Sequence, residues 1–433
     1  MIGRAAATGV PLSTMAVLML SVFTVSVGYG VVLPLLPYLI ERLLGAAGDA
    51  AQVSRSTGLL TAIYMVSLFV FAPIWGRLSD RYGRRPVLLI GLLGFGATML
   101  TFAFFDNLPA VYAERFLSGL FAAAITPVAL AVVGDLAATE VGRARRLTFV
   151  SLAGVSGFLL GPTLGVFLAT SAGSMLPAAG PATAFPLAGT AALAFLVAVV
   201  AAITVPRTRH GEASSTSGQL ALKSGPLLVP RLLLLAFIVA AGVGVFEVGL
   251  ALRGKQELGL SQYQIALMFT ECSLVMFAVQ AVVFSPWLKP ETTRWFIAPA
   301  FAVLALGLFL VPRASDFVVM LMVIGAVAAS AGILSPILTY WISNKAGKAQ
   351  GRQLGKQTAA ASLGAAAGSA AGGLLFDVAW LPDASFLLVT ALITLGFVVS
   401  LGLPKLLGPR TLGDTARVGA LAKAAPPAGK SRS

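Results

Sequence analysis

The stretch GRLSDRYGRRP, residues 76–86, lies between two long apolar runs and holds four arginines, one aspartate and two glycines. Elsewhere the sequence is poor in charge, since only 11% of the 433 residues are charged while 58% are hydrophobic. A soluble protein of this length needs far more polar surface than that. The apolar runs are about 20 residues long, which is the length a helix needs to cross a bilayer. The quoted stretch is therefore a short polar loop between two membrane-spanning helices.

Twelve such runs predict twelve transmembrane helices in an all-α membrane protein. None of them shows the period-2 alternation of a barrel strand, and no small-residue cleavage site follows the first run, which we expect to be retained. The runs cover about 13–40, 57–75, 86–105, 108–133, 147–170, 184–205, 231–252, 263–286, 295–312, 317–342, 357–378 and 384–404.

The basic residues are distributed unevenly between the loops on the two sides. If the N-terminus is inside, the cytoplasmic segments hold 24 of the 30 lysines and arginines, whereas the outer side holds Arg42, Arg55, Arg253, Lys255 and Arg313. Cytoplasmic loops of membrane proteins carry such an excess. We therefore expect a multi-pass protein of the cell's inner (plasma) membrane with both termini in the cytoplasm. The net charge of +14 is then a matter of topology and does not indicate a nucleic-acid partner.

A polar stretch divides the pattern into six runs before it and six after it. We expect an N-terminal six-helix half (1–205), a cytoplasmic linker (206–230), a C-terminal six-helix half (231–404) and a basic tail (405–433). Serine, glycine and proline make the linker flexible, and the composition of the tail predicts disorder.

The two halves also resemble each other in sequence. SLAGVSGFLLG at 151–161 and SLGAAAGSAAG at 362–372 share a serine, a leucine and two glycines at an offset of 211 residues. This match, in the fifth run of each half, predicts two parallel repeats.

Few residues could support enzymatic or metal chemistry. Cys272, the one cysteine, lies inside an apolar run, and His210, the one histidine, lies in the linker. The chain also has no nucleotide-binding loop. We therefore expect no catalytic residues, no metal site and no cofactor, and the protein is not expected to be an enzyme.

The opening loop resembles the signature G-x-x-x-D-R-x-G-R-R of the major facilitator superfamily. Glycine permits a tight turn and close helix approach, and arginine can bridge carboxylates. The resemblance implies that the aspartate contacts the start of helix 11 and closes the cytoplasmic side. It also implies that an arginine bridges this aspartate to an acid at the end of helix 4. The matching residues, expected to act in gating, are Gly76, Asp80, Arg81, Gly83, Arg84 and Arg85, with Asp135 as that acid.

A second motif, GFLLGPTLG at 157–165, lies in the fifth run. Gly157, Gly161 and Gly165 recur every four residues and so share one helix face, and Pro162 removes a backbone donor. Ordinary small-residue packing also explains this pattern. It resembles the antiporter motif of drug:proton exporters, which implies an interface that seals one conformation. The first run, GYGVVLPLLP, resembles tetracycline-type exporters, but Val25 stands where some of them carry an acid.

Four charged residues inside apolar runs are candidates for proton and substrate coupling: Glu114, Arg115, Glu247 and Glu271. Charges in a membrane are costly and mark functional sites. A carboxyl group there can hold a proton or pair with a cationic substrate, although each of these residues could instead be a hydrogen-bonded structural group. Polar residues that could line a central cavity are Ser26, Tyr29, Tyr64, Thr126, Gln280, Tyr340 and Trp341.

The resemblance implies a twelve-helix major facilitator fold, active as a monomer, that exchanges protons for a small-molecule substrate by alternating access. Proton-coupled export of a drug or metabolite is the favoured function. Uptake or facilitated transport of a nutrient, organic acid or metal complex on the same fold is the first alternative. A membrane receptor or scaffold that does not transport is the second.

Overall fold

The computed structural model describes residues 11–45, 49–102, 104–136, 140–175, 184–206, 227–283, 290–345, 350–378, 380–381 and 383–407, and the account below concerns these residues. They are almost entirely helical, as the sequence predicts. The helices are α1 (Leu12–Leu44), α2 (Ala50–Tyr82), α3 (Arg84–Phe102), α4 (Leu108–Leu136), α5 (Glu140–Met175), α6 (Ala184–Thr204), α7 (Leu228–Gln256), α8 (Gln262–Val283), η2 (Pro290–Phe296), α9 (Ile297–Leu310), η3 (Val311–Arg313), α10 (Phe317–Lys345), α11 (Gln350–Leu374), α12 (Ala384–Ser400) and α13 (Leu403–Leu407).

Within the described residues, ten helices are long and apolar enough to cross a membrane. The helix α11 falls short because it starts with the polar sequence QGRQLGKQT and continues mainly in alanine and glycine, and α12 has only 17 residues. Both pack against spanning helices, since α11 lies on α7 and α2 while α12 lies on α9 and α7. The arrangement is consistent with twelve spans.

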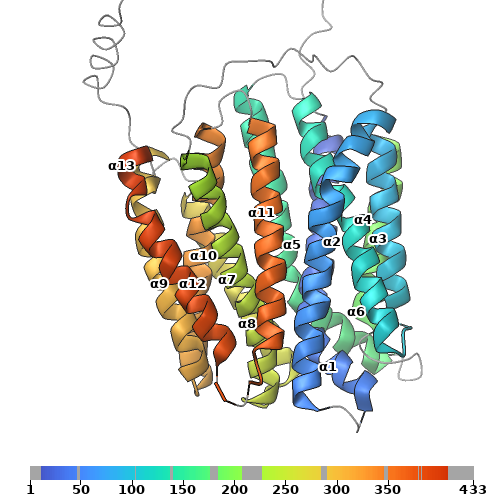
Figure 1. Cartoon of the computed structure of the whole chain (residues 1–433). Coiled ribbons are helices and arrows are strands. Elements are labelled where there is room, and N and C mark those ends of the chain that lie inside the picture. The colour runs from blue at the N-terminus through green and yellow to red at the C-terminus, as the bar shows by residue number, and fades with distance from the viewer. Residues whose placement is uncertain are drawn as a thin grey trace, which may run out of the picture.

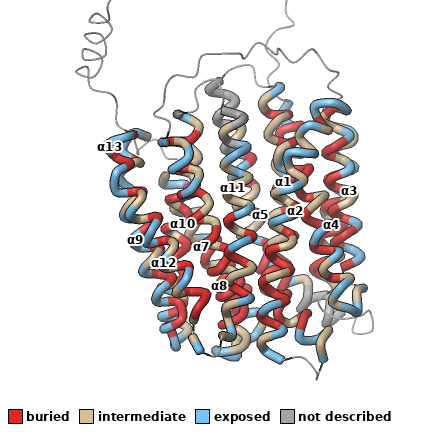
Figure 2. Tube along the Cα trace, viewed as in Figure 1, coloured by how far each residue is buried: buried red, intermediate tan, exposed pale blue. Residues whose placement is uncertain are grey.

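The helices form two groups that lie side by side in Figure 1. We call α1–α6 the N-terminal set and α7–α13 the C-terminal set. Each set has its own hydrophobic cluster, one drawn from residues 15–205 and the other from residues 228–407 together with Leu33 of α1. Figure 2 shows exposed residues on the outer helix faces. Many of these are apolar, such as Ile203, which is 79% exposed, and they suit contact with lipid.

The bundle has two ends, which we name by the chain segments there. At the termini end, α1 begins, α13 ends and α2 turns into α3; at the far end, α1 connects to α2 and α7 to α8 (Figure 1). The helix α7 starts at Leu228, earlier than the expected linker boundary at 230, because proline is tolerated in the first turn of a helix. After a turn at 401–402 the chain forms one more short helix, α13, which ends at Leu407 and buries Leu403 and Leu407. Most of the expected linker (207–226) and tail (408–433) lies outside the described residues.

Helix contacts relate the two sets by a repeat, with a register that differs from the sequence match. A Cβ atom on Gly157 would meet the carbonyl oxygen of Phe23, and one on Gly364 would meet that of Phe237. One turn later, Gly161 faces the carbonyl of Val27, while Gly368 faces that of Ala241. The α1–α5 pair therefore corresponds to the α7–α11 pair.

In this correspondence Gly161 matches Gly368, an offset of 207 residues, whereas the sequence match paired it with Gly372 at an offset of 211. The offset of 211 was therefore wrong by one helical turn. Small residues recur at nearly every turn of α11, so that a slip of four residues leaves the sequence similarity almost unchanged. Contact with the carbonyl groups of α7 decides the register.

Candidate substrate and coupling site

The two sets are joined at the far end by a group of contacts that we call the far-end seal. The hydroxyl of Tyr38 donates to the carbonyl of Leu260 at 2.6 Å, and the Lys255 ammonium donates to the carbonyl of Pro37 at 3.1 Å and pairs with Glu41. A Cβ atom added to Gly58 of α2 would lie 2.6 Å from the Cα of Gly373 in α11. These helices touch at the backbone, as small residues permit in membranes. Two more seal residues, Ser54 and Gln256, form a hydrogen bond at 3.1 Å.

The termini end is more open. The Asp80 side chain is 65% exposed, and added Cβ atoms on Gly76 of α2 and Gly355 of α11 would each meet nothing within 4 Å. Asp80 pairs with Arg84. The residues that lead into α11 (346–349) lie outside the described part of the chain, so the expected contact between Asp80 and the start of helix 11 stays a prediction. Helices joined at one end and apart at the other are what an alternating-access transporter shows in one of its two states.

Arg84 links two carboxylates in this opened region. Its Nη1 lies 2.5 Å from Asp80 Oδ1, and its Nε lies 3.0 Å from Asp135 Oδ2. The bridge expected between the aspartate of the loop and the acid at the end of helix 4 is therefore present. Ser79, which sequence reasoning missed, is buried and accepts a further hydrogen bond from Arg84 Nη1 at 2.7 Å. The bridge fixes the loop to α4 in this state, while its role in gating stays a prediction.

The stretch 76–86 is helical except at Gly83, because α2 continues to Tyr82 and α3 begins at Arg84, so the expected loop is a one-residue turn between two helix ends. The remaining residues of the stretch hold this turn. Gly83 has φ of 97°, a conformation that favours glycine, and its N–H donates to the carbonyl of Ser79. Arg85 donates to the carbonyl of Ala202 in α6, and Arg81 lies 5.4 Å from the ring centroid of Tyr82. The spacing of glycine and arginine in the motif is thus explained by local geometry: the glycine makes the turn, and the arginines fasten it to α4 and α6.

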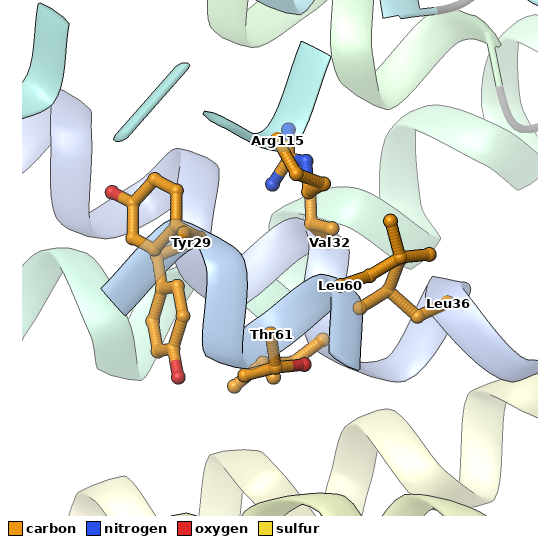
Figure 3. A pocket seen from close by; sticks show the side chains of 8 residues that line it. Tyr29, Val32, Leu36, Leu60, Thr61 and Arg115 are labelled. Atoms are coloured by element: carbon orange, nitrogen blue, oxygen red, sulfur yellow. The ribbon is translucent and has the colours of Figure 1, made fainter. Parts of the chain in front are cut away.

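An aromatic cluster occupies the middle of the bundle. The Tyr29 ring stacks on Tyr64 at 5.5 Å and on Phe158 at 5.8 Å between ring centroids. A small cavity lies beside it, lined by Tyr29, Tyr64, Arg115 and apolar residues of α1 and α2. Figure 3 shows Tyr29, Thr61 and Arg115 on its wall. The cluster combines flat apolar faces with polar tips, as small-molecule sites in proteins commonly do.

The Glu114 and Arg115 side chains form a buried ion pair next to this cavity. Arg115 donates to Glu114 through Nε at 2.6 Å and Nη2 at 2.8 Å, and both residues are 2% exposed. The guanidinium carbon lies 4.5 Å from the ring centroid of Phe102 and 5.8 Å from that of Tyr64. A pair this well satisfied can be purely structural, and this geometry alone does not separate that reading from a coupling role.

Glu247 lies where the two sets meet at mid-depth. Its Oε2 accepts a hydrogen bond of 2.6 Å from the Tyr29 hydroxyl, so that a carboxylate of α7 is joined to a phenol of α1. Both residues are partly exposed although they lie within long apolar helices. Among the described residues, Glu247 is the coupling candidate that forms a hydrogen bond across the two sets.

Glu271 is placed apart from this network. Its Oε2 is buried without a hydrogen-bond partner, and its Oε1 lies 3.1 Å from where a Cβ of Gly325 in α10 would be. A neighbouring hydroxyl, that of Thr270, forms a hydrogen bond of 2.7 Å with Thr163 of α5. Glu271 is therefore a separate carboxyl group between α8 and α10, and its coupling role stays a prediction.

The glycine face of α5 packs against α1, within the N-terminal set. Cβ atoms on Gly157 and Gly161 would lie 2.4 and 2.8 Å from carbonyl oxygens of α1, while at Gly165 the nearest atom, of Val31, is 3.4 Å away. Pro162 packs against Gly30, at 3.1 Å from an added Cβ there. The first two glycines are thus required for close packing and the third is not. Whether this face seals one conformation stays a prediction.

Sequence reasoning missed the far-end seal. Its polar members Glu41, Ser54, Lys255 and Gln256 belong to segments that read as ordinary loop edges. Of the candidate cavity residues, Tyr29 and Tyr64 lie in the central cluster, whereas Trp341 is buried against Thr293 and donates to its hydroxyl. A basic residue on the sparsely charged outer side, such as Lys255, was the one available signal for the seal.

Comparisons with known proteins agree with this architecture. The chain is 28% identical over 399 residues to multidrug resistance protein 1 of Bacillus subtilis (strain 168), covering 90% of this chain and 95% of that protein. It is 25% identical over 363 residues to the quinolone resistance protein NorA of Staphylococcus aureus (strain COL), covering 84% and 89%.

Solved structures share the fold. A D-xylose–proton symporter superposes with a TM-score of 0.74 at 15% identity, covering 90% of this chain and 97% of that one. A bacterial homologue of the human lysosomal transporter Spinster, in an inward-facing and unoccupied conformation, gives 0.70 at 14% identity, covering 92% and 98%. The family model described as Major Facilitator Superfamily matches residues 18–355. With the helical bundle and the loop at 76–86, this match establishes that the chain belongs to the Major Facilitator Superfamily.

Proposed function

We propose that this transporter exports a drug-like or metabolite small molecule in exchange for protons. The observation that carries the proposal is a partly exposed carboxyl group, Glu247, set beside an aromatic cluster where the two helix sets meet. Such a group can bind either a proton or a cationic substrate, and an exchanger needs a site at which the two compete. The relatives named for multidrug and quinolone resistance support export over uptake.

The proposed orientation places the termini end in the cytoplasm, in the cell's inner membrane. The excess of basic residues in the segments at that end supports it. The state described above would then be inward-open, with the far-end seal closing the outer side. The protein is proposed to work as a monomer of two six-helix halves, joined by the linker at 206–230.

In the proposed cycle, the inward-open protein takes up substrate from the cytoplasm beside Tyr29, Tyr64 and Glu247. The halves then rock, so that the far-end seal opens and the loop at 76–86 closes the cytoplasmic side through Asp80 and Arg84. A proton from outside replaces the substrate on Glu247 and returns to the cytoplasm. Exchange of one proton for one monovalent cation moves no net charge, so the pH gradient drives it. One pH unit supplies about 1.4 kcal/mol, which supports a substrate gradient of about tenfold.

A flux assay in proteoliposomes tests the proposal. The purified protein is reconstituted and a quinolone, or else a fluorescent cationic dye, is offered to vesicles with an imposed pH gradient. Exchange predicts accumulation of the probe in vesicles that are acid inside, whereas proton-coupled uptake predicts accumulation in vesicles that are acid outside. If vesicles that contain the protein accumulate no more probe than protein-free vesicles in either gradient, transport of these probes is contradicted.

The role of Glu247 is tested with Glu247→Gln, which keeps the side-chain shape but cannot ionise. We expect accumulation driven by the pH gradient to be lost, while counterflow of the probe, which needs no net proton movement, persists. The matched control is Glu271→Gln, a carboxyl on the neighbouring helix without a partner in the other set. If Glu271→Gln abolishes accumulation and Glu247→Gln does not, the coupling carboxyl is Glu271.

A further inference from the structure

We propose that Tyr29 is a positioning residue that prevents the empty, unprotonated transporter from changing state, by holding the ionised Glu247 carboxylate across the two helix sets. The inference rests on the proposed function, because it assigns to Glu247 the exchange of a proton for substrate. It goes beyond that function by naming the contact that keeps proton movement coupled to substrate movement.

The geometry suits a charge-assisted bond. The Tyr29 hydroxyl lies 2.6 Å from Glu247 Oε2, within the 2.5–2.7 Å typical of an O–H donor to a carboxylate. Bonds to an ionised acceptor are roughly twice as strong as neutral ones. Protonation of Glu247, or a cation bound to it, therefore weakens the link between α1 and α7.

The Tyr29 side chain is fixed in place by its neighbours. Its ring stacks on Tyr64 and on Phe158, and a Cβ on the adjacent Gly30 would lie 3.0 Å from the Phe158 carbonyl oxygen. A hydroxyl whose ring is held by two stacked neighbours loses little further freedom when it donates to Glu247, so more of the bond's free energy is available to join the sets.

The groups that surround Glu247 leave this bond as the element that senses its charge. The other contacts between the sets that carry titratable side chains, Tyr38 with Leu260 and Lys255 with Glu41, lie at the far end. The contact between Thr163 and Thr270 joins two hydroxyls that do not ionise. The helix α12 has no titratable residue. The helices α10 and α11 have four, which lie toward the termini end: Tyr340, Lys345, Arg352 and Lys356. The titratable or charged groups that face Tyr29 are Tyr64 of α2 and Arg115 of α4. The one that faces Glu247 from α8 is Cys272, which also faces Glu271.

The bond matches what an exchanger requires. Exchange fails when the empty transporter changes between its inward-open and outward-open states, because the substrate or the proton can then move down its own gradient without the other. In the empty state Glu247 is ionised, Tyr29 holds it, and the far-end seal stays shut. A proton or a cationic substrate on Glu247 weakens its hydrogen bond with Tyr29, and each loaded form can then change between the two states.

Tyr29→Phe tests this idea, with Tyr263→Phe, at an exposed tyrosine of α8 outside the aromatic cluster, as the control. Each variant removes one phenol hydroxyl, but only the first removes the donor to Glu247. In proteoliposomes with a pH gradient and no substrate, we expect Tyr29→Phe to raise proton leak about 10- to 100-fold, which corresponds to about 1.4–2.8 kcal/mol. Counterflow of the probe persists while its accumulation falls. An unchanged leak in Tyr29→Phe, or an equal leak in Tyr263→Phe, overturns the proposal.

A distance measurement separates this proposal from the proposed function. Spin labels at Arg55→Cys and Trp380→Cys, exposed positions at the far end, are placed in a Cys272→Ser background. The parent protein is expected to open its far end as the pH falls and Glu247 gains a proton, whereas Tyr29→Phe is expected to be more open already at high pH and to respond less. If no probe is transported, this result still supports the hold. Identical pH responses in parent and Tyr29→Phe refute it, whatever the flux assay shows.

Discussion

The contact between α2 and α11 at Gly58 and Gly373 allows a single methyl group to shift the conformational equilibrium. In Gly373→Ala the new Cβ would lie 2.4 Å from the carbonyl oxygen of Ser54 and 2.6 Å from the Cα of Gly58. Ordinary contact begins near 3.5 Å, so α2 and α11 must separate by about 1 Å for the methyl group to fit. The atoms on the opposite side are backbone, which cannot turn away.

The expected cost follows from this overlap. Overpacking of a tight contact costs typically about 1–3 kcal/mol. That cost falls on the far-end-closed state alone, because the two helices part when the far end opens. The ratio of open to closed protein is therefore expected to rise by about 5- to 150-fold.

The assay is the distance distribution between the spin labels at positions 55 and 380. Gly373→Ala should increase the long-distance fraction, whereas Gly355→Ala should not. This control is the same substitution in the same helix, and its added Cβ meets nothing within 4 Å. Thermal unfolding of both variants shows whether the bundle is intact. An unchanged distribution in Gly373→Ala, or an equal shift in Gly355→Ala, refutes the reasoning about the seal.

Two further changes test the N-terminal set. Gly161→Ala places a Cβ 2.8 Å from the Val27 carbonyl oxygen and should reduce both the transport flux and the melting temperature. Gly165→Ala, the control, adds a Cβ whose contacts begin at an ordinary 3.4 Å and should change neither quantity. Equal effects of the two variants contradict the packing of α5 on α1. Glu114→Gln leaves the buried guanidinium of Arg115 without its ionised partner and should lower the free energy of unfolding by about 3–5 kcal/mol. Adding Arg115→Gln should recover part of that loss, and no recovery would argue against a simple ion pair.

Sequence alone determined the class of fold. The apolar runs near 20 residues, the loop at 76–86 and the uneven basic charge are local features, because each follows from what a single segment needs in order to cross a membrane or stay out of it. The arginine bridge to Asp135 was also expected, because the family resemblance implies an acid at the end of helix 4 as the partner of the motif.

The tertiary structure decided which residues meet across the two helix sets. Tyr29 and Glu247 are 218 positions apart, and their hydrogen bond depends on how α1 and α7 are rotated against each other. The same holds for Gly58 with Gly373, and for the repeat register, which the carbonyl groups of α7 set against the glycines of α11. Residues of this kind carry no signal in their own segment, since a tyrosine or glycine in an apolar helix is compatible with many packings. Contact between distant helices is a property of the assembled bundle, and it places the proposed coupling site where the two sets join.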